Sequence, residues 1–107
     1  MSTETQNIIV EIKESLNLSF PGMIAKIILF GSQLLKDPLE DADYDFLVVL
    51  KNDYDWKLKH KILDVCFDTA IKYNQVFDIK VISEKELSTD RGKQPFVLEA
   101  LEHGVLE

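Results

Sequence analysis

Two aspartates, Asp43 and Asp45, stand two residues apart at the head of the apolar run 46–50. Residues at positions i and i+2 of a β-strand point to the same face of a sheet, which brings their carboxylates close together. Neighbouring carboxylate oxygens are the ligands that a hard cation such as Mg²⁺ prefers. The pair therefore predicts a divalent-metal site, although an Asp-x-Asp pair by itself is also compatible with a solvated strand end.

A third carboxylate, Asp78, stands in a later apolar segment, 76–82, which also reads as a strand. Alternation along this strand puts Asp78 and Lys80 on one face and the apolar residues on the other. Burying a carboxylate in such a strand costs free energy unless a counter-charge compensates it. A metal shared with the first two aspartates would do so, provided that the two strands are neighbours in the sheet.

A Gly-Ser pair, Gly31-Ser32, follows the apolar run 23–30, which we predict to be the first strand. We predict a short helix over 32–36 directly after it. A strand that ends in Gly-Ser and turns into a helix presents free backbone N–H groups to an anion such as a phosphate. A phosphate cradle beside metal-binding carboxylates indicates nucleotide chemistry, with Lys36 or Lys80 as a point charge for a phosphate.

Together, the stretches Leu29-Phe30-Gly31-Ser32 and Asp43-Tyr44-Asp45-Phe46 resemble the minimal nucleotidyltransferases of the DNA polymerase β superfamily. The resemblance extends from the strand at residue 23 to the helix that ends near residue 104. It implies nucleotidyl transfer from ATP or another nucleoside triphosphate, with two Mg²⁺ ions and loss of pyrophosphate. It also implies site residues: catalytic and metal-binding Asp43, Asp45 and Asp78, and nucleotide-binding Gly31, Ser32 and Lys36.

The short chain leaves little room for an acceptor pocket, so we expect a partner protein to present the acceptor hydroxyl. Small proteins of this kind resemble the antitoxin half of toxin–antitoxin modules, in which the partner is an all-helical HEPN protein and AMP is often transferred. Two departures keep alternatives open: the family's usual Ala-Arg-Gly reads Leu34-Leu35-Lys36, and its usual Ser before the first aspartate is Ala42. One alternative is an antitoxin of the same fold that acts by binding alone, and another is a generic acidic domain.

The chain has 107 residues, a net charge of −7 and 46% hydrophobic residues, which fits a single domain over residues 1–107. Such a negative chain lacks the basic face of a general nucleic-acid binder, so direct nucleic-acid binding is not expected. Its single cysteine, Cys66, excludes an internal disulfide and fits a cytoplasmic location. No signal peptide is visible and no apolar run approaches a membrane span, so no membrane association is expected.

Hydrophobic periodicity predicts helices over 7–18, 54–73 and 95–104, with strands over 23–30, 44–50 and 76–82. Residues 52–53 are expected to cap the second helix, Ser83 and Glu86 to form a capping box, and 89–92 to form a loop. The side of the second helix predicted to be buried consists of Trp56, Leu63, Phe67, Ala70 and Ile71. The resulting fold class is α/β (α+β): a short mixed sheet with helices packed mainly on one face and the aspartates on the open face.

Overall fold

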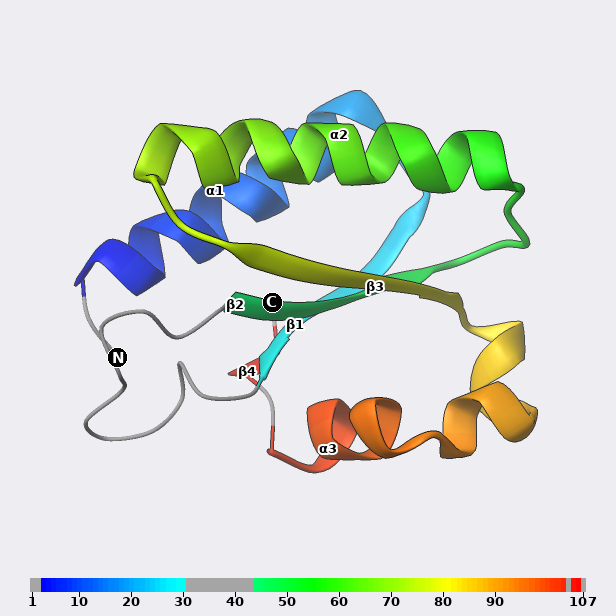
Figure 1. The fold of residues 1–107 in the computed structure, drawn as a ribbon. Helices are drawn as coiled ribbons and strands as arrows, with labels where there is room; N and C mark the ends of the chain where they lie inside the picture. Colours follow the sequence, from blue (N-terminus) through cyan, green and yellow to red (C-terminus); the bar gives the residue numbers. More distant parts are fainter. Residues whose placement is uncertain (1–2, 31–43, 104, 107) are drawn as a thin grey trace.

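A β-sheet lies between helices on both of its faces (Figure 1). The computed structural model describes residues 3–30, 44–103 and 105–106. Helices α1 and α2 lie over one face of the sheet, and the shorter α3 lies against the other. In chain order the elements are α1 (Thr3–Ser19), β1 (Ile24–Phe30), β2 (Tyr44–Leu50), α2 (Trp56–Tyr73), β3 (Phe77–Ser83), the 3₁₀ turns η2 (Lys85–Ser88) and η3 (Asp90–Lys93), α3 (Pro95–His103) and β4 (Val105–Leu106).

The strands lie in the order β3-β2-β1-β4, so β3 and β4 form the two edges of the described sheet. Strand β1 runs antiparallel to both of its neighbours, whereas β2 and β3 run parallel. A parallel pair cannot be joined by a tight turn and needs a long crossover, which α2 supplies. The predicted mixed sheet is confirmed, and the strand with Asp78 neighbours the strand with Asp45, as the metal-site hypothesis required.

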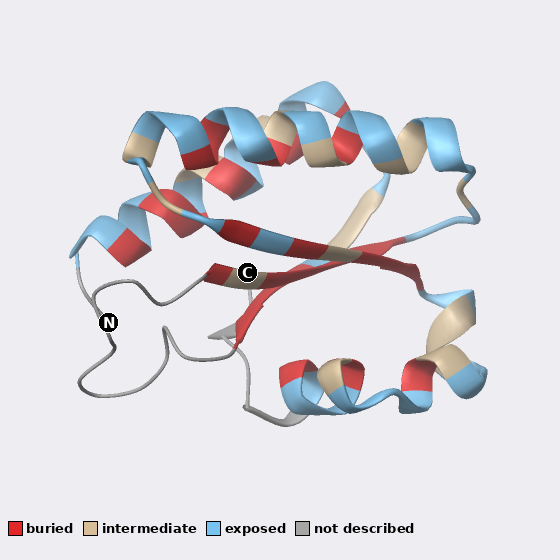
Figure 2. Ribbon diagram, viewed as in Figure 1, coloured by how far each residue is buried: buried red, intermediate tan, exposed pale blue. Residues whose placement is uncertain are grey.

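From Phe46 to Leu50 the central strand β2 is apolar on both faces, because helices cover both faces. On one side, Phe46 packs in the same core as Ile62 of α2. On the other side, Leu47 and Val49 share a second, smaller core with Val97 of α3. Figure 2 shows burial along almost all of β2, whereas β1 and β3 also carry intermediate and exposed positions. The two long helices therefore lie on one face, as predicted, while α3 partly covers the face that was expected to be open.

The prediction of the buried side of α2 was wrong for three of its five residues. Trp56, Phe67 and Ile71 are 68%, 41% and 78% exposed, whereas Leu63 is half-buried and Ala70 is buried. The side that faces the sheet consists of Ile62, Cys66, Thr69 and Ala70. Helix α2 carries two apolar stripes, and periodicity along the sequence cannot decide which of them packs against the sheet.

The ends of α2 follow local hydrogen-bonding signals. The helix begins at Trp56 with Asp55 as its N-cap, and Asp55 Oδ1 accepts a hydrogen bond from the Leu58 N–H at 2.9 Å. The predicted caps at 52–53 therefore lie too early in the chain. Asn74 ends the helix in the left-handed conformation, with φ of 53°, which asparagine tolerates better than most residues.

The capping box predicted after β3 is confirmed. The Glu86 N–H donates to Ser83 Oγ and the Ser83 N–H donates to Glu86 Oε1, each at 3.2 Å. The predicted loop over 89–92 was wrong, because this segment enters η3. Gly92 allows η3 to approach η2 closely, since a Cβ at this position would lie 2.1 Å from the carbonyl oxygen of Leu87.

The remaining predicted bounds agree with the structure to within a few residues. Strand β2 matches its prediction, β1 and β3 each begin one residue later, and α3 begins at Pro95 as predicted. Helix α1 begins at Thr3, earlier than the predicted residue 7. The short helix predicted over 32–36 and the helix end at residue 104 lie outside the described residues.

Candidate metal and nucleotide site

Asp45 and Asp78 lie side by side on the sheet. They are direct partners in the parallel pairing of β2 and β3, where neighbouring strands are about 4.8 Å apart. Both alternate with residues such as Phe46 and Ile79 that pack under α1 and α2, so both aspartates belong to the α3 face. Asp45 is half-buried and Asp78 is exposed. The sheet thus joins two of the three predicted carboxylates from segments that α2 separates in the sequence.

The end of β1 borders this carboxylate pair. Phe30, the last residue of β1, is paired with Asp45 across the antiparallel β1–β2 ladder. The next residues in the sequence are the Gly-Ser pair that was predicted to bind phosphate. The other predicted site residues lie outside the described residues: Gly31, Ser32, Lys36 and Asp43.

Lys80 supplies a positive charge next to Asp78. Its Nζ lies 3.4 Å from Asp78 Oδ1, and both side chains keep more than two fifths of their surface exposed. The same Nζ lies 5.7 Å from the centre of the Phe96 ring at the start of α3. Strand alternation predicted that Asp78 and Lys80 share a face. The contact with Phe96 was not predicted, because no pattern in the sequence shows where α3 packs.

The pair of aspartates fits a hard divalent cation by its chemistry, since carboxylate oxygens are the ligands that Mg²⁺ selects. Like charges directly opposite each other on neighbouring strands repel, and a cation between them would relieve that repulsion. Within the described ranges, no three His, Cys, Asp or Glu side chains form a metal-binding group. Two of the three predicted ligands, Asp45 and Asp78, lie within those ranges, and the predicted third ligand, Asp43, lies outside them.

Cys66 is not part of this site. Its side chain is fully buried on the α2 side of the sheet, away from the α3 face. Burial raises the pKa of the Cys66 thiol to about 12, so the nucleophilic thiolate is scarce near neutral pH. Cys66 is therefore a core residue.

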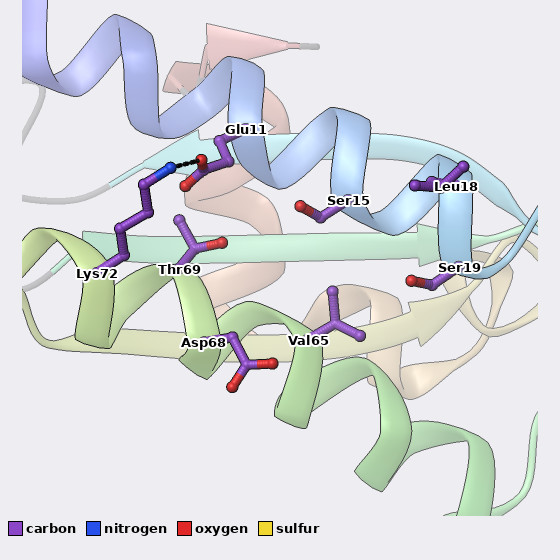
Figure 3. A pocket seen from close by; sticks show the side chains of 8 residues that line it. All are labelled: Glu11, Ser15, Leu18, Ser19, Val65, Asp68, Thr69 and Lys72. Carbon is purple, nitrogen blue, oxygen red and sulfur yellow. Dashed lines mark hydrogen bonds and ion pairs between the residues drawn. The ribbon is translucent and has the colours of Figure 1, made fainter.

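A cavity of about 340 Å³ lies between α1 and α2, on the face of the sheet opposite to the aspartates. Figure 3 shows its lining, across which Lys72 of α2 forms an ion pair with Glu11 of α1. This partner raises the pKa of the Lys72 ammonium, because the Glu11 carboxylate stabilises the charged form. The ion pair joins the two helices, and the cavity lies on the opposite face of the sheet from the carboxylate pair.

The chain matches a known protein family over most of its length: residues 9–103 match the nucleotidyltransferase domain. It is similar to two proteins of Methanocaldococcus jannaschii that are named "Putative protein adenylyltransferase", MJ0604 and MJ0141. The first is 35% identical over 96 residues, which span 90% of each chain. The second is 28% identical over 102 residues, which span 95% of this chain and 97% of the relative.

A solved structure has a similar fold. It is a chain from the crystal structure of a mutant toxin–antitoxin MntA–HpeT, with a TM-score of 0.62. The alignment covers 91% of this chain and 69% of the solved chain, at 15% sequence identity. At this low identity the match concerns the fold, and it confirms the nucleotidyltransferase-like α+β architecture.

Within the described part of the chain, no helix has the length and apolar content needed to span a membrane.

Proposed function

Because this chain belongs to the nucleotidyltransferase domain family, we propose that it transfers AMP from ATP to a hydroxyl group on a partner protein. The names of the two relatives support AMP as the transferred group and a protein as the acceptor. The observation that carries the proposal is the direct pairing of Asp45 with Asp78 beside the end of β1. This is where metal-binding carboxylates and a Gly-Ser phosphate site have to meet for the reaction.

In this proposal, Asp43, Asp45 and Asp78 hold two Mg²⁺ ions. Bound Mg²⁺ supplies positive charge that neutralises the triphosphate and favours ionisation of the attacking hydroxyl. The backbone N–H groups of Gly31 and Ser32, with the Ser32 hydroxyl, bind the β- and γ-phosphates. Lys36 and Lys80 add point charges for the phosphates.

The proposed reaction balances as a single displacement at the α-phosphorus of ATP. The acceptor oxygen forms a bond to that phosphorus while the bond from phosphorus to the bridging oxygen breaks, and pyrophosphate leaves with the electron pair. Asp78 accepts the hydroxyl proton, because it is the exposed member of the carboxylate pair and is open to an incoming acceptor. Asp45 is half-buried and serves as a ligand.

The proposed biological role is that of an antitoxin whose partner is a helical HEPN-type toxin. The solved chain with the same fold comes from a toxin–antitoxin complex, which supports a toxin as the partner. A second candidate function is neutralisation of the partner by binding alone. The sequence Leu34-Leu35-Lys36 favours this candidate, because Lys36 lacks the bidentate donors that the family's usual arginine offers to phosphate.

The deciding experiment incubates the chain, Mg²⁺ and the product of the neighbouring gene with ATP labelled at the α-phosphate or, separately, at the γ-phosphate. AMP transfer puts only the α-label on the partner, and Asp45→Asn or Asp78→Asn abolishes it. The matched control, Asp90→Asn, neutralises an exposed aspartate outside the site and should retain transfer. Transfer of the γ-label would contradict the proposal, and tight partner binding without any label would support the second candidate.

A further inference from the structure

Helix α2 presents an apolar stripe that is largely exposed to solvent, although Leu63 within it also packs against the core. The stripe consists of Trp56, Leu63, Phe67 and Ile71, whose spacing places them along one side of a helix. Three of the four are exposed, and Trp56 and Ile71 keep more than two thirds of their surface free. The sheet is already packed by the other side of α2, through residues such as Ile62 and Cys66. Exposed apolar surface arranged this regularly is typical of a protein–protein interface.

Charges along one margin of this stripe are segregated by sign. Lys57 and Lys61 come first along α2, and Asp64 and Asp68 follow them, all four of them exposed. Like charges four residues apart weaken an isolated helix by about 0.2–0.5 kcal/mol for each pair. None of these four takes part in the salt bridges found among the described residues. Lys61 and Asp64, three residues apart, offset part of this repulsion, and all four charges remain available to a second chain.

A second copy of the same helix fits this pattern when it runs antiparallel. The alignment that puts Lys57 opposite Asp68 of the second copy also puts Lys61 opposite Asp64, because both pairs are centred between residues 62 and 63. In this alignment Trp56 of one copy lies between Phe67 and Ile71 of the other. In a parallel pair this margin of one copy would face the opposite margin of the other copy, so these four charges would not meet. The charge pattern thus matches its own antiparallel copy.

We propose that the stripe on α2 is a homodimer interface in which two copies pair through antiparallel α2 helices. The 18 residues of α2 provide about 27 Å of helix for this contact. Pairing through the adjacent sheet edge is less favourable, because the Val81 carbonyl on β3 is already occupied. It accepts hydrogen bonds from Tyr54 Oη at 3.1 Å and from Arg91 Nη2 at 3.0 Å. This interface lies on the face of the sheet opposite to the aspartates and leaves them accessible.

The test is a charge exchange read out by sedimentation equilibrium of the full chain, over concentrations from about 1 µM to about 1 mM. Salt of about 0.15 M screens the net charge of −7 that each copy carries. The wild type should dimerise. The double variants Lys57→Glu/Lys61→Glu and Asp64→Lys/Asp68→Lys should each dimerise at least about tenfold more weakly, since like charges then face each other. An equimolar mixture of the two variants should recover a heterodimer, because all four contacts are again between opposite charges.

Ile71→Ser tests the apolar part of the interface, and Leu98→Ser on α3 is its matched control, since both residues are exposed leucine-sized side chains on helices. Ile71→Ser should weaken the dimer about tenfold, while Leu98→Ser should leave the dissociation constant unchanged. Circular dichroism checks that all variants remain folded. A wild type that stays monomeric over the whole range overturns the proposal, even if the stripe binds another protein. Dimerisation that the charge variants leave unchanged also overturns it.

Discussion

Asp45 on β2 and Asp78 on β3 are direct partners of a parallel strand pair, and both belong to the sheet face on which α3 packs. Two carboxylates in this relationship repel each other unless a cation lies nearby. Lys80 Nζ lies 3.4 Å from Asp78 Oδ1, so Lys80 supplies part of the compensating positive charge from within the chain. We therefore expect a divalent cation to bind beside these two carboxylates.

Mg²⁺ should stabilise the wild-type chain against heat through the two aspartates. A cation that binds only the folded state raises the free energy of unfolding, and at saturating Mg²⁺ the melting temperature should rise by about 4 °C or more. Asp45→Asn and Asp78→Asn should remove this increase, since each deletes a ligand. Differential scanning calorimetry with and without Mg²⁺ measures the effect. Asp90→Asn is the control that should keep it, and a wild type indifferent to Mg²⁺ would contradict the metal site.

Lys80→Met should weaken the binding of ATP while leaving the fold intact. Loss of a charge-assisted contact to phosphate should raise the dissociation constant about five- to thirtyfold, and Lys80→Arg should restore most of the affinity. The free energy of unfolding should change by less than about 0.5 kcal/mol, because the ion pair with Asp78 is exposed. Isothermal titration calorimetry measures the affinity. Lys85→Met removes a comparable exposed lysine, paired with Asp53, and should have no effect on ATP binding.

Ser32→Ala should weaken ATP binding about tenfold without a comparable loss of stability. The expectation comes from the predicted order of strand, Gly-Ser and helix, which would direct hydrogen-bond donors toward a phosphate. Titration of ATP into both proteins, with thermal melts of each, separates the two effects. A lowered melting temperature with unchanged ATP affinity would identify Ser32 as a structural cap instead.

The stability of the fold should decrease at alkaline pH through Cys66. Its thiol has a pKa of about 12 in the folded chain against an ordinary value of 9.0, so the unfolded chain loses the proton first. The contribution of the buried, neutral thiol to the free energy of unfolding is fully present below about pH 9. It is lost as pH rises toward 12, with a limiting slope of about 1.4 kcal/mol per pH unit. Urea unfolding at about pH 8 and about pH 10 measures the effect, and the loss between these two pH values should be about 1.4 kcal/mol in total.

Cys66→Ala should show a smaller decrease in stability between those two pH values. Part of the decrease should remain in the variant, because burial and the Glu86 carboxylate also raise the pKa of the Tyr54 hydroxyl. Equal slopes for the wild type and the variant would show that Cys66 does not contribute to the alkaline instability.

Much of this protein can be predicted from local sequence patterns, because short-range chemistry determines them. The apolar run of β2, the reciprocal hydrogen bonds of Ser83 and Glu86, and the start of α3 at Pro95 depend on residues close together in the chain. Strand alternation likewise predicted that Asp78 and Lys80 share a face. The family resemblance added the roles of the aspartates, and the match of residues 9–103 confirmed the family.

Other features depend on how distant segments pack, and only the tertiary structure decided them. The pairing of Asp45 with Asp78 exists because α2 carries the chain across to a parallel register, which neither strand specifies alone. The choice between the two apolar stripes of α2 is made by the sheet, which buries Ile62 and Cys66 and leaves Trp56 and Ile71 in solvent. Periodicity shows that a helix has an apolar face, but the surface that the rest of the chain offers determines which face is buried.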